Sequence, residues 1–175
     1  MAADWTVAER EHHEEVAAFV ATLRAVPTDR WHHRADPARW TAAELVLHVI
    51  TAYELGEGVG RGEPGMALRL PKWRAWLLRT FALPRIFASR RFPKDAPAPR
   101  EVRPDPDAAA QLTPAVAIAR LEAAAEAARH VLRTAGPDAG MVHAYFGRLT
   151  PLQTLRLLSA HTRHHTLGLR ARSEA

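Results

Sequence analysis

Helical periodicity, interrupted by capping residues and prolines, is the feature of this chain that most constrains its fold. Four segments repeat apolar residues every three to four positions, and none shows the apolar and polar alternation of a half-buried strand. The first predicted helix runs from about Trp5 to Ala25 and ends before Pro27. The pattern therefore predicts an all-α fold.

The other three predicted helices have clear start signals. Each begins with a threonine that can act as N-cap, followed by a capping box or by proline in the first turn. The second helix is apolar nearly all round, so we expect it to be central, and the third should stop at Gly136-Pro137. The start signals are Thr41 with Glu44, Thr113 with Pro114, and Thr150 with Pro151.

An insert of about 55 residues, at positions 59–112, separates the second and third predicted helices. It is far longer than a usual connection in a helical bundle. Part of it has helical spacing and places Trp73, Trp76, Leu77 and Phe81 on one face, with arginines beside them. The stretch from Phe92 to Pro106 is rich in proline, so we expect it to be extended or irregular.

Composition and length favour a single globular domain over residues 1–175. The chain is 47% hydrophobic and 25% charged, and no apolar run approaches the roughly 20 residues that span a bilayer. The N-terminus lacks the pattern of a signal peptide, so we expect a cytoplasmic protein. The chain has no cysteine, which leaves histidine and carboxylate as metal ligands and requires any reacting thiol to come from outside.

The net charge of +5 is unevenly distributed. Residues 61–103 hold eleven Lys or Arg against three acidic residues. However, 22 of the 24 basic residues are arginine and alanine is abundant, a bias typical of GC-rich bacterial genomes. No groove-reading motif accompanies the charge, so we expect no specific nucleic-acid partner.

Three histidines fall on predicted apolar helix faces. His161 and His165 lie four residues apart on the last helix and could share a metal, and His48 lies on the second helix. From the residues alone, a metal site and satisfied core histidines both remain open. His164 lies at the edge of the apolar stripe, as a surface group or a neighbour of the site. Glu44, one turn before His48, could orient an imidazole, although its capping role already explains it.

The remaining polar candidates are expected to have structural roles. The other histidines lie in polar surroundings or lack a spaced partner, which favours surface or capping positions, and packing is the expected role of two tyrosines and one arginine near the predicted site. These residues are His12, His13, His32, His33, His130 and His143, and Tyr53, Tyr145 and Arg148.

Three short motifs carry a family resemblance. They are Trp40-Thr41 at the entry of the helix that bears His48, Phe146-Gly147-Arg148-Leu149 before the last helix, and the closing pair His161 and His165. Together they resemble the DinB-like (YfiT-like) four-helix bundle superfamily of bacterial metalloproteins. The resemblance covers nearly the whole chain, with a looser match over residues 61–110.

The resemblance implies an up-and-down four-helix bundle in which His48, His161 and His165 bind a divalent metal. Three neutral nitrogen ligands leave a coordination position open, as in catalytic zinc sites, and nickel, iron or cobalt would also fit. Characterised relatives include thiol-dependent transferases and isomerases. We therefore expect a metal-dependent transferase with a low-molecular-weight thiol, or a hydrolase, acting on a small molecule, with Glu44 as the one candidate catalytic group.

The alternative is a non-enzymatic bundle that binds a metal or small ligand. In that case the basic insert would engage an anionic partner, either a membrane or a nucleic acid. Otherwise the aromatic face of the insert should dock on the bundle, cover the metal pocket or form a homodimer contact. Fold alone does not separate an enzyme from a binding module.

Overall fold

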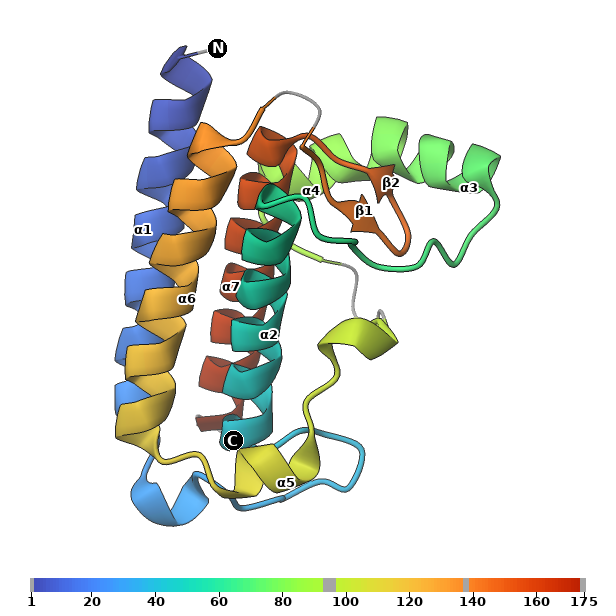
Figure 1. Cartoon of the computed structure of the whole chain (residues 1–175). Coiled ribbons are helices and arrows are strands. Elements are labelled where there is room, and N and C mark those ends of the chain that lie inside the picture. The colour runs from blue at the N-terminus through green and yellow to red at the C-terminus, as the bar shows by residue number, and fades with distance from the viewer. Residues whose placement is uncertain (1, 93–96, 137–138, 174–175) are drawn as a thin grey trace.

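Four long helices form a bundle in the computed structural model, which describes residues 2–92, 97–136 and 139–173 (Figure 1). Helix α1 packs against α7, and α2 packs against α6. The all-α prediction is confirmed. The bundle helices are α1 (Ala2–Arg24), α2 (Ala42–Gly60), α6 (Pro114–Thr134) and α7 (Pro151–Ser173).

The directions of the helices explain the long insert. Arg129 near the end of α6 pairs with Glu9 near the start of α1, so these two helices are antiparallel. In contrast, the close approach of Gly60 to Val131 joins the ends of α2 and α6, which run in parallel. The chain must therefore return along the bundle between them (Figure 1). Along the chain, successive bundle helices alternate in direction, except that α2 and α6, on either side of the insert, run the same way.

The predicted helix starts are confirmed at all three threonines. Thr41 and Glu44 form a reciprocal capping box, in which each side chain accepts a hydrogen bond from the other residue's backbone N–H. Thr113 accepts a hydrogen bond from the Val116 amide. Thr150 and Gln153 also exchange side-chain to backbone hydrogen bonds, at 3.2 and 3.0 Å. Helix α6 ends at Thr134, and Pro137 of the predicted stop lies outside the described residues.

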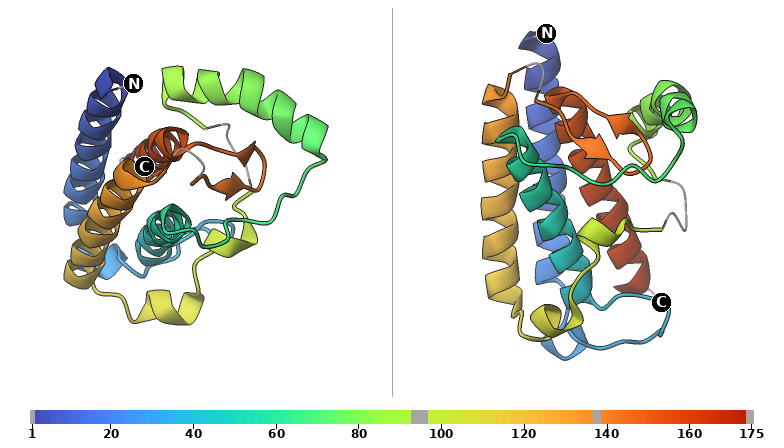
Figure 2. Two further views of the ribbon diagram at one scale, coloured as in Figure 1. Left: turned by 45° about the horizontal axis from the view of Figure 1, so that its top comes forward. Right: turned by 45° about the vertical axis from the view of Figure 1, so that its right-hand side comes forward.

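The insert contains one long helical stretch with three parts. These are α3 (Lys72–Leu77), a π-helical segment η2 (Leu78–Ala82) and α4 (Leu83–Ser89). Its α4 end packs against α7, and its α3 end extends away from the bundle beside a small hairpin (Figure 2). Its buried residues are Ala75, Leu83 and Ile86.

The prediction that the Trp73, Trp76, Leu77 and Phe81 face docks on the bundle or covers the pocket is wrong. All four side chains are exposed. The helix carries apolar residues on two faces, and it is the other face that packs inward.

The rest of the insert is irregular with short helical turns. These are η3 (Arg100–Val102) and α5 (Pro106–Ala110). Outside the insert, a similar short turn, η1 (Thr28–Arg30), lies between α1 and α2. Residues 93–96 of the predicted proline-rich stretch lie outside the described part of the chain. The backbone carbonyl of Val102 in η3 forms a hydrogen bond with the side chain of His48 on α2.

A β-hairpin before α7 was not predicted. Strands β1 (Val142–His143) and β2 (Gly147–Arg148) pair antiparallel, too short for a recognisable alternating pattern. The segment that leaves α2 joins this hairpin, since the Met66 amide donates to the Val142 carbonyl at 2.8 Å. Residues of α2, α4, α7 and the hairpin region form a second core cluster. Its members are Val59, Leu83, Ile86, Met141, Phe146, Leu149, Leu157 and Ala160.

None of the described helices is long and apolar enough to cross a membrane.

Candidate metal centre

Three imidazoles from two helices meet where α2 and α7 face the insert. His48 extends from α2, and His161 and His165 extend from successive turns of α7. The Nε2 atom of His161 lies 2.9 Å from Nε2 of His48 and 2.9 Å from Nε2 of His165. One ligand atom from each of the three lies within 4.8 Å of the others. The structure thus brings together all three histidines that the sequence singled out.

The insert fixes the orientation of His48. Its Nδ1 donates to the backbone carbonyl of Val102 in η3 at 2.6 Å, so in the neutral ring the proton resides on Nδ1. The lone pair of Nε2 then faces the other two histidines. A backbone carbonyl on the far nitrogen is the usual arrangement for a histidine that binds a metal.

The close contacts between nitrogens fit a cation better than they fit hydrogen bonds. With the His48 Nε2 unprotonated, the single ring proton available at His161 Nε2 can serve only one of its two neighbours. One of the two contacts therefore has no proton between its nitrogens. Tetrahedral coordination at about 2.0–2.1 Å places ligand nitrogens roughly 3.3 Å apart. The two separations of 2.9 Å are close to this value, and the whole cluster lies within 4.8 Å. The donor set therefore suits a divalent ion.

Burial favours the neutral form of two of these imidazoles, His48 and His161. It lowers the pKa of His48 to about 4, although the hydrogen bond to Val102 partly opposes this. Burial is also the main reason that the pKa of His161 lies well below its ordinary value, and the neighbouring imidazoles lower it further. A metal binds the neutral imidazole, so no proton has to be displaced at neutral pH.

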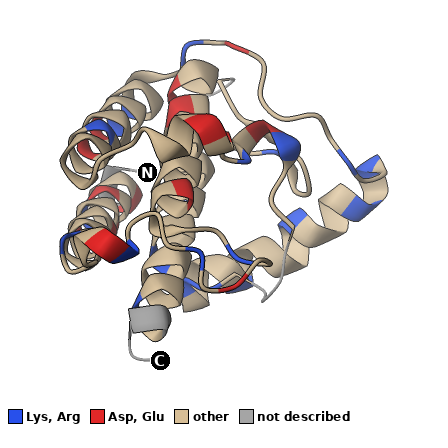
Figure 3. Cartoon of the chain, turned by 90° about the horizontal axis from the view of Figure 1, so that it is seen from below, with Lys and Arg blue, Asp and Glu red and all other residues tan. Residues whose placement is uncertain are grey.

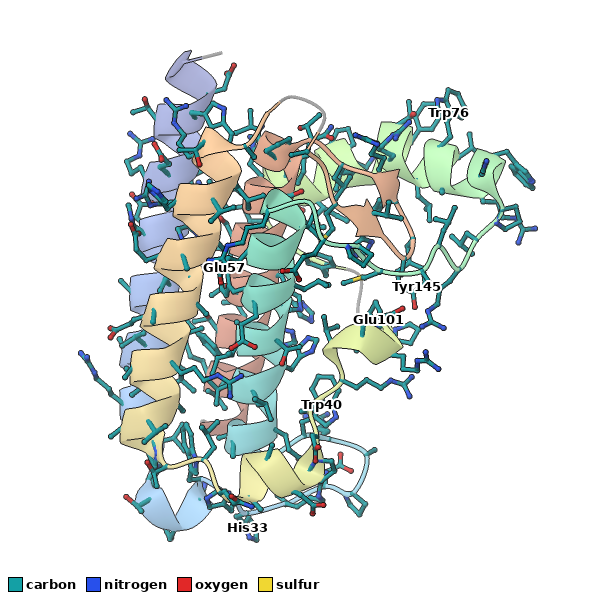
Figure 4. The ribbon with its side chains drawn as sticks, in the orientation of Figure 1. His33, Trp40, Glu57, Trp76, Glu101 and Tyr145 are labelled. Atoms are coloured by element: carbon teal, nitrogen blue, oxygen red, sulfur yellow. The ribbon has the colours of Figure 1, made fainter. Side chains whose placement is uncertain are left out.

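A cavity of about 680 Å³ adjoins the three histidines. This is within the range of about 300–1,000 Å³ for small-molecule sites. Trp40 and Phe92 contribute aromatic walls, and Trp40 and Tyr145 lie on the same side of α2 (Figure 4). Leu78 and Ile86 from the insert complete the apolar lining. The arrangement can hold a small, largely apolar molecule beside the three nitrogens.

His143 is a polar residue of this cavity that the sequence did not reveal. Its expected surface or capping role is wrong, because it is buried and stacks on Phe146 with ring centroids 4.8 Å apart. Burial lowers its pKa to about 4, and its Nδ1 accepts the Tyr145 amide at 3.2 Å. The neutral ring therefore carries its proton on Nε2. The aromatic residues that follow it in sequence were the available signal.

Glu44 is engaged in structural contacts. Its carboxylate accepts hydrogen bonds from the Thr41 amide and from Arg34. Burial raises its pKa, but these hydrogen bonds outweigh that effect and hold the pKa below its ordinary value. The capping role is thus confirmed, and Glu44 is absent from the described residues that line the cavity.

The other sequence candidates divide between surface and core. His13, His32, His33 and His130 are exposed, as predicted. His164 lines the cavity and is half-buried, with its ring centroid 5.9 Å from that of Phe92. Tyr53 is buried and shares a hydrogen bond of 2.8 Å with Thr162, so its packing role is confirmed. Tyr145 lines the cavity and donates to the Pro97 carbonyl.

His12 is the clearest exception among the histidines. Its predicted surface or capping position is wrong, because it is 1% exposed and packs edge-on against Tyr53. The signal was present in the sequence: His12 shares the helical spacing of Val16, Phe19 and Leu23, which form the inner face of α1.

The sequence profile of the DinB superfamily matches residues 11–167. The chain belongs to the DinB superfamily. The match to the DinB superfamily includes His48, His161 and His165, the cluster that could hold a metal ion. No curated protein and no solved structure matches the chain.

Proposed function

We propose that His48, His161 and His165 bind a divalent metal ion at the active site of an enzyme that joins a small electrophilic molecule to an external thiol. Zinc is the first candidate, and nickel, iron and cobalt have compatible ligand preferences. The observation that carries the proposal is the convergence of three Nε2 atoms on the wall of a cavity of about 680 Å³.

The bound cation would supply Lewis acidity, which lowers the pKa of a ligated thiol or water. The chain's own residues bind and orient. Val102 holds His48 with its lone pair toward the site, and the aromatic walls at Trp40 and Phe92 exclude water. We assign His143 the role of a hydrogen-bond donor to an oxygen of the substrate through Nε2, because its Nδ1 is already an acceptor.

Metal analysis of the untagged protein tests the site. We expect about one divalent ion per chain, and loss of that ion in the variant His161→Ala/His165→Ala. The exposed pair His33→Ala/His130→Ala is the matched control, because it removes two imidazoles from the surface. Stoichiometric metal that survives in the first variant would rule out this ligand set.

Activity is tested with two panels of substrates, each with and without metal. One panel pairs electrophiles with several low-molecular-weight thiols, and the other contains model esters and amides. We expect metal-dependent turnover in the thiol panel. Turnover confined to esters and amides would replace thiol transfer by hydrolysis, and metal binding without turnover in either panel would favour a binding module.

A further inference from the structure

The helical stretch α3–η2–α4 presents a contiguous apolar face to solvent. Trp73, Trp76 and Phe81 are 59%, 52% and 54% exposed, and Leu77 is 36% exposed. At about 100° per residue Trp73, Trp76 and Leu77 share one side of α3, and Phe81 in η2 joins this face through its ring contact with Trp76. The rings of Trp76 and Phe81 lie edge-to-face, 6.5 Å apart, and Trp76 points away from the body of the protein (Figure 4). Single exposed apolar residues are ordinary, but a face of four indicates a surface that binds something.

The opposite side of this helix holds it in place. Ala75, Leu83 and Ile86 are buried, and Ile86 belongs to the core cluster shared with α7 and the hairpin. The Arg79 guanidinium also donates to the Arg148 carbonyl of β2 at 2.9 Å. The aromatic face cannot turn inward without breaking this core. Its exposure is therefore fixed by the fold.

Cations border the aromatic face on both edges. On the helical projection of α3, Lys72 lies along one edge of the face and Arg74 along the other, and Arg85 is exposed four residues beyond Phe81. The sequence holds no Asp or Glu from residue 64 to residue 94. Figure 3 accordingly shows basic residues and no acidic ones on this helix. By contrast, Arg90, just past α4, contacts Glu11 and Glu15.

We propose that this face docks on the surface of an anionic lipid membrane. Tryptophan favours the headgroup region of a bilayer, and long cationic side chains beside an apolar stripe can reach the lipid phosphates. A second copy of the chain is a poorer occupant, because pairing two such faces would bring their cations together. A nucleic acid would neutralise the cations but would leave the apolar centre without an apolar partner.

Vesicle co-sedimentation of the full chain tests this proposal. We expect binding to vesicles of phosphatidylglycerol and phosphatidylcholine at least about tenfold tighter than to phosphatidylcholine alone, weakening with salt. Tryptophan emission should shift to the blue on binding. Trp76→Ala/Phe81→Ala and Lys72→Gln/Arg74→Gln should each lower binding by roughly tenfold or more.

The matched control is Val116→Ala/Arg30→Gln, which changes an exposed apolar residue and an exposed arginine elsewhere. It should bind vesicles as the wild type does, and circular dichroism should show equal helix content in all variants. The proposal is overturned by wild-type protein that binds no vesicle, or by vesicle binding that survives in Trp76→Ala/Phe81→Ala. A dimer in sedimentation equilibrium that this variant dissociates, or DNA binding without vesicle binding, would also overturn it.

Discussion

The Val102 carbonyl and the Tyr145 amide each hold one imidazole of the cavity in a single tautomer. The first accepts from Nδ1 of His48, and the second donates to Nδ1 of His143. The two rings therefore differ in what they offer: His48 presents a lone pair at Nε2, whereas His143 presents an N–H. A ligand for a cation and a donor for an anionic oxygen thus lie in one cavity.

This difference predicts separate effects of substitution. His143→Phe keeps a ring that can stack on Phe146 but removes the N–H, so we expect kcat to fall by about 10²-fold. Metal content should stay at the wild-type level, because His143 is not among the three proposed ligands. Steady-state kinetics and elemental analysis of the same sample check both statements. Loss of metal together with activity would contradict the assigned role.

His12 predicts a pH dependence of stability. Burial first, and the neighbouring His13 second, lower its folded pKa from 6.5 to about 4. As the pH falls, His12 therefore becomes protonated near pH 6.5 in the unfolded chain but only near pH 4 in the folded protein. Above pH 6.5 His12 is neutral in both states and does not affect the unfolding free energy. As the pH falls from 6.5 toward 4, the unfolding free energy decreases.

We expect His12→Gln to reduce the slope of unfolding free energy against pH by up to about 1.4 kcal/mol per pH unit near pH 5. Urea denaturation between pH 4 and 7 measures that slope. His33→Gln is the control, because His33 is exposed, and it should leave the slope unchanged. An equal slope in His12→Gln and wild type would show that His12 titrates normally in the fold.

At the scale of the elements, helix starts could be predicted because they depend on local chemistry. Thr41, Thr113 and Thr150 all cap helices as their sequence neighbours indicate. The orientation of the insert could not be predicted in this way. The helix around Trp76 has apolar residues on two sides, and its packing against α7 and the hairpin decides which side is buried. That hairpin is too short to leave a periodic pattern.

Substitution of Gly140, which precedes the hairpin, tests how tightly the hairpin region is packed. A Cβ at this position would overlap the carbonyl oxygen of Leu149, so the backbone would have to move. We expect Gly140→Ala to cost about 1–3 kcal/mol of unfolding free energy. Gly136→Ala is the matched control, since its Cβ would have no neighbour within 4 Å. Chemical denaturation of both variants gives the comparison, and equal stability would mean that the hairpin adapts without strain.

At the scale of the whole molecule, the histidine cluster connects helices that are distant in sequence. His48 and His161 are 113 residues apart, and a bound ion would tie α2 to α7. Metal that binds only the folded state stabilises it by about 2.7 kcal/mol at 100 times Kd. For a domain of this size that corresponds to a rise in Tm of about 5–10 °C. Thermal melts with and without a chelator measure it.

The control for this melt is His161→Ala/His165→Ala, which should show the same Tm with metal and with chelator. A metal-dependent rise that persists in this variant would place the stabilising ion elsewhere. Because the effect is on unfolding, it is measured independently of any catalytic assay.

The clustering of the three histidines of the candidate site could be predicted from the sequence, and their surroundings could not. His48, His161 and His165 stand on apolar helix faces, and the family resemblance placed them together. Val102 contributes through its backbone carbonyl, which leaves no trace in the residue type. The cavity wall at Leu78 and Ile86 depends on a crossover whose path only the fold determines.

Because α2 and α6 run in parallel, the long insert between them is a place where the chain could be split into two fragments of two bundle helices each. A cut between Phe92 and Pro97 would leave one fragment with α1, α2 and His48, and a second with α6, α7 and the histidine pair. Neither fragment holds more than two of the three imidazoles, and the carbonyl that orients His48 belongs to the second fragment. Reassembly of such a split protein would restore the complete ligand set, so metal binding would serve as a reporter of complementation.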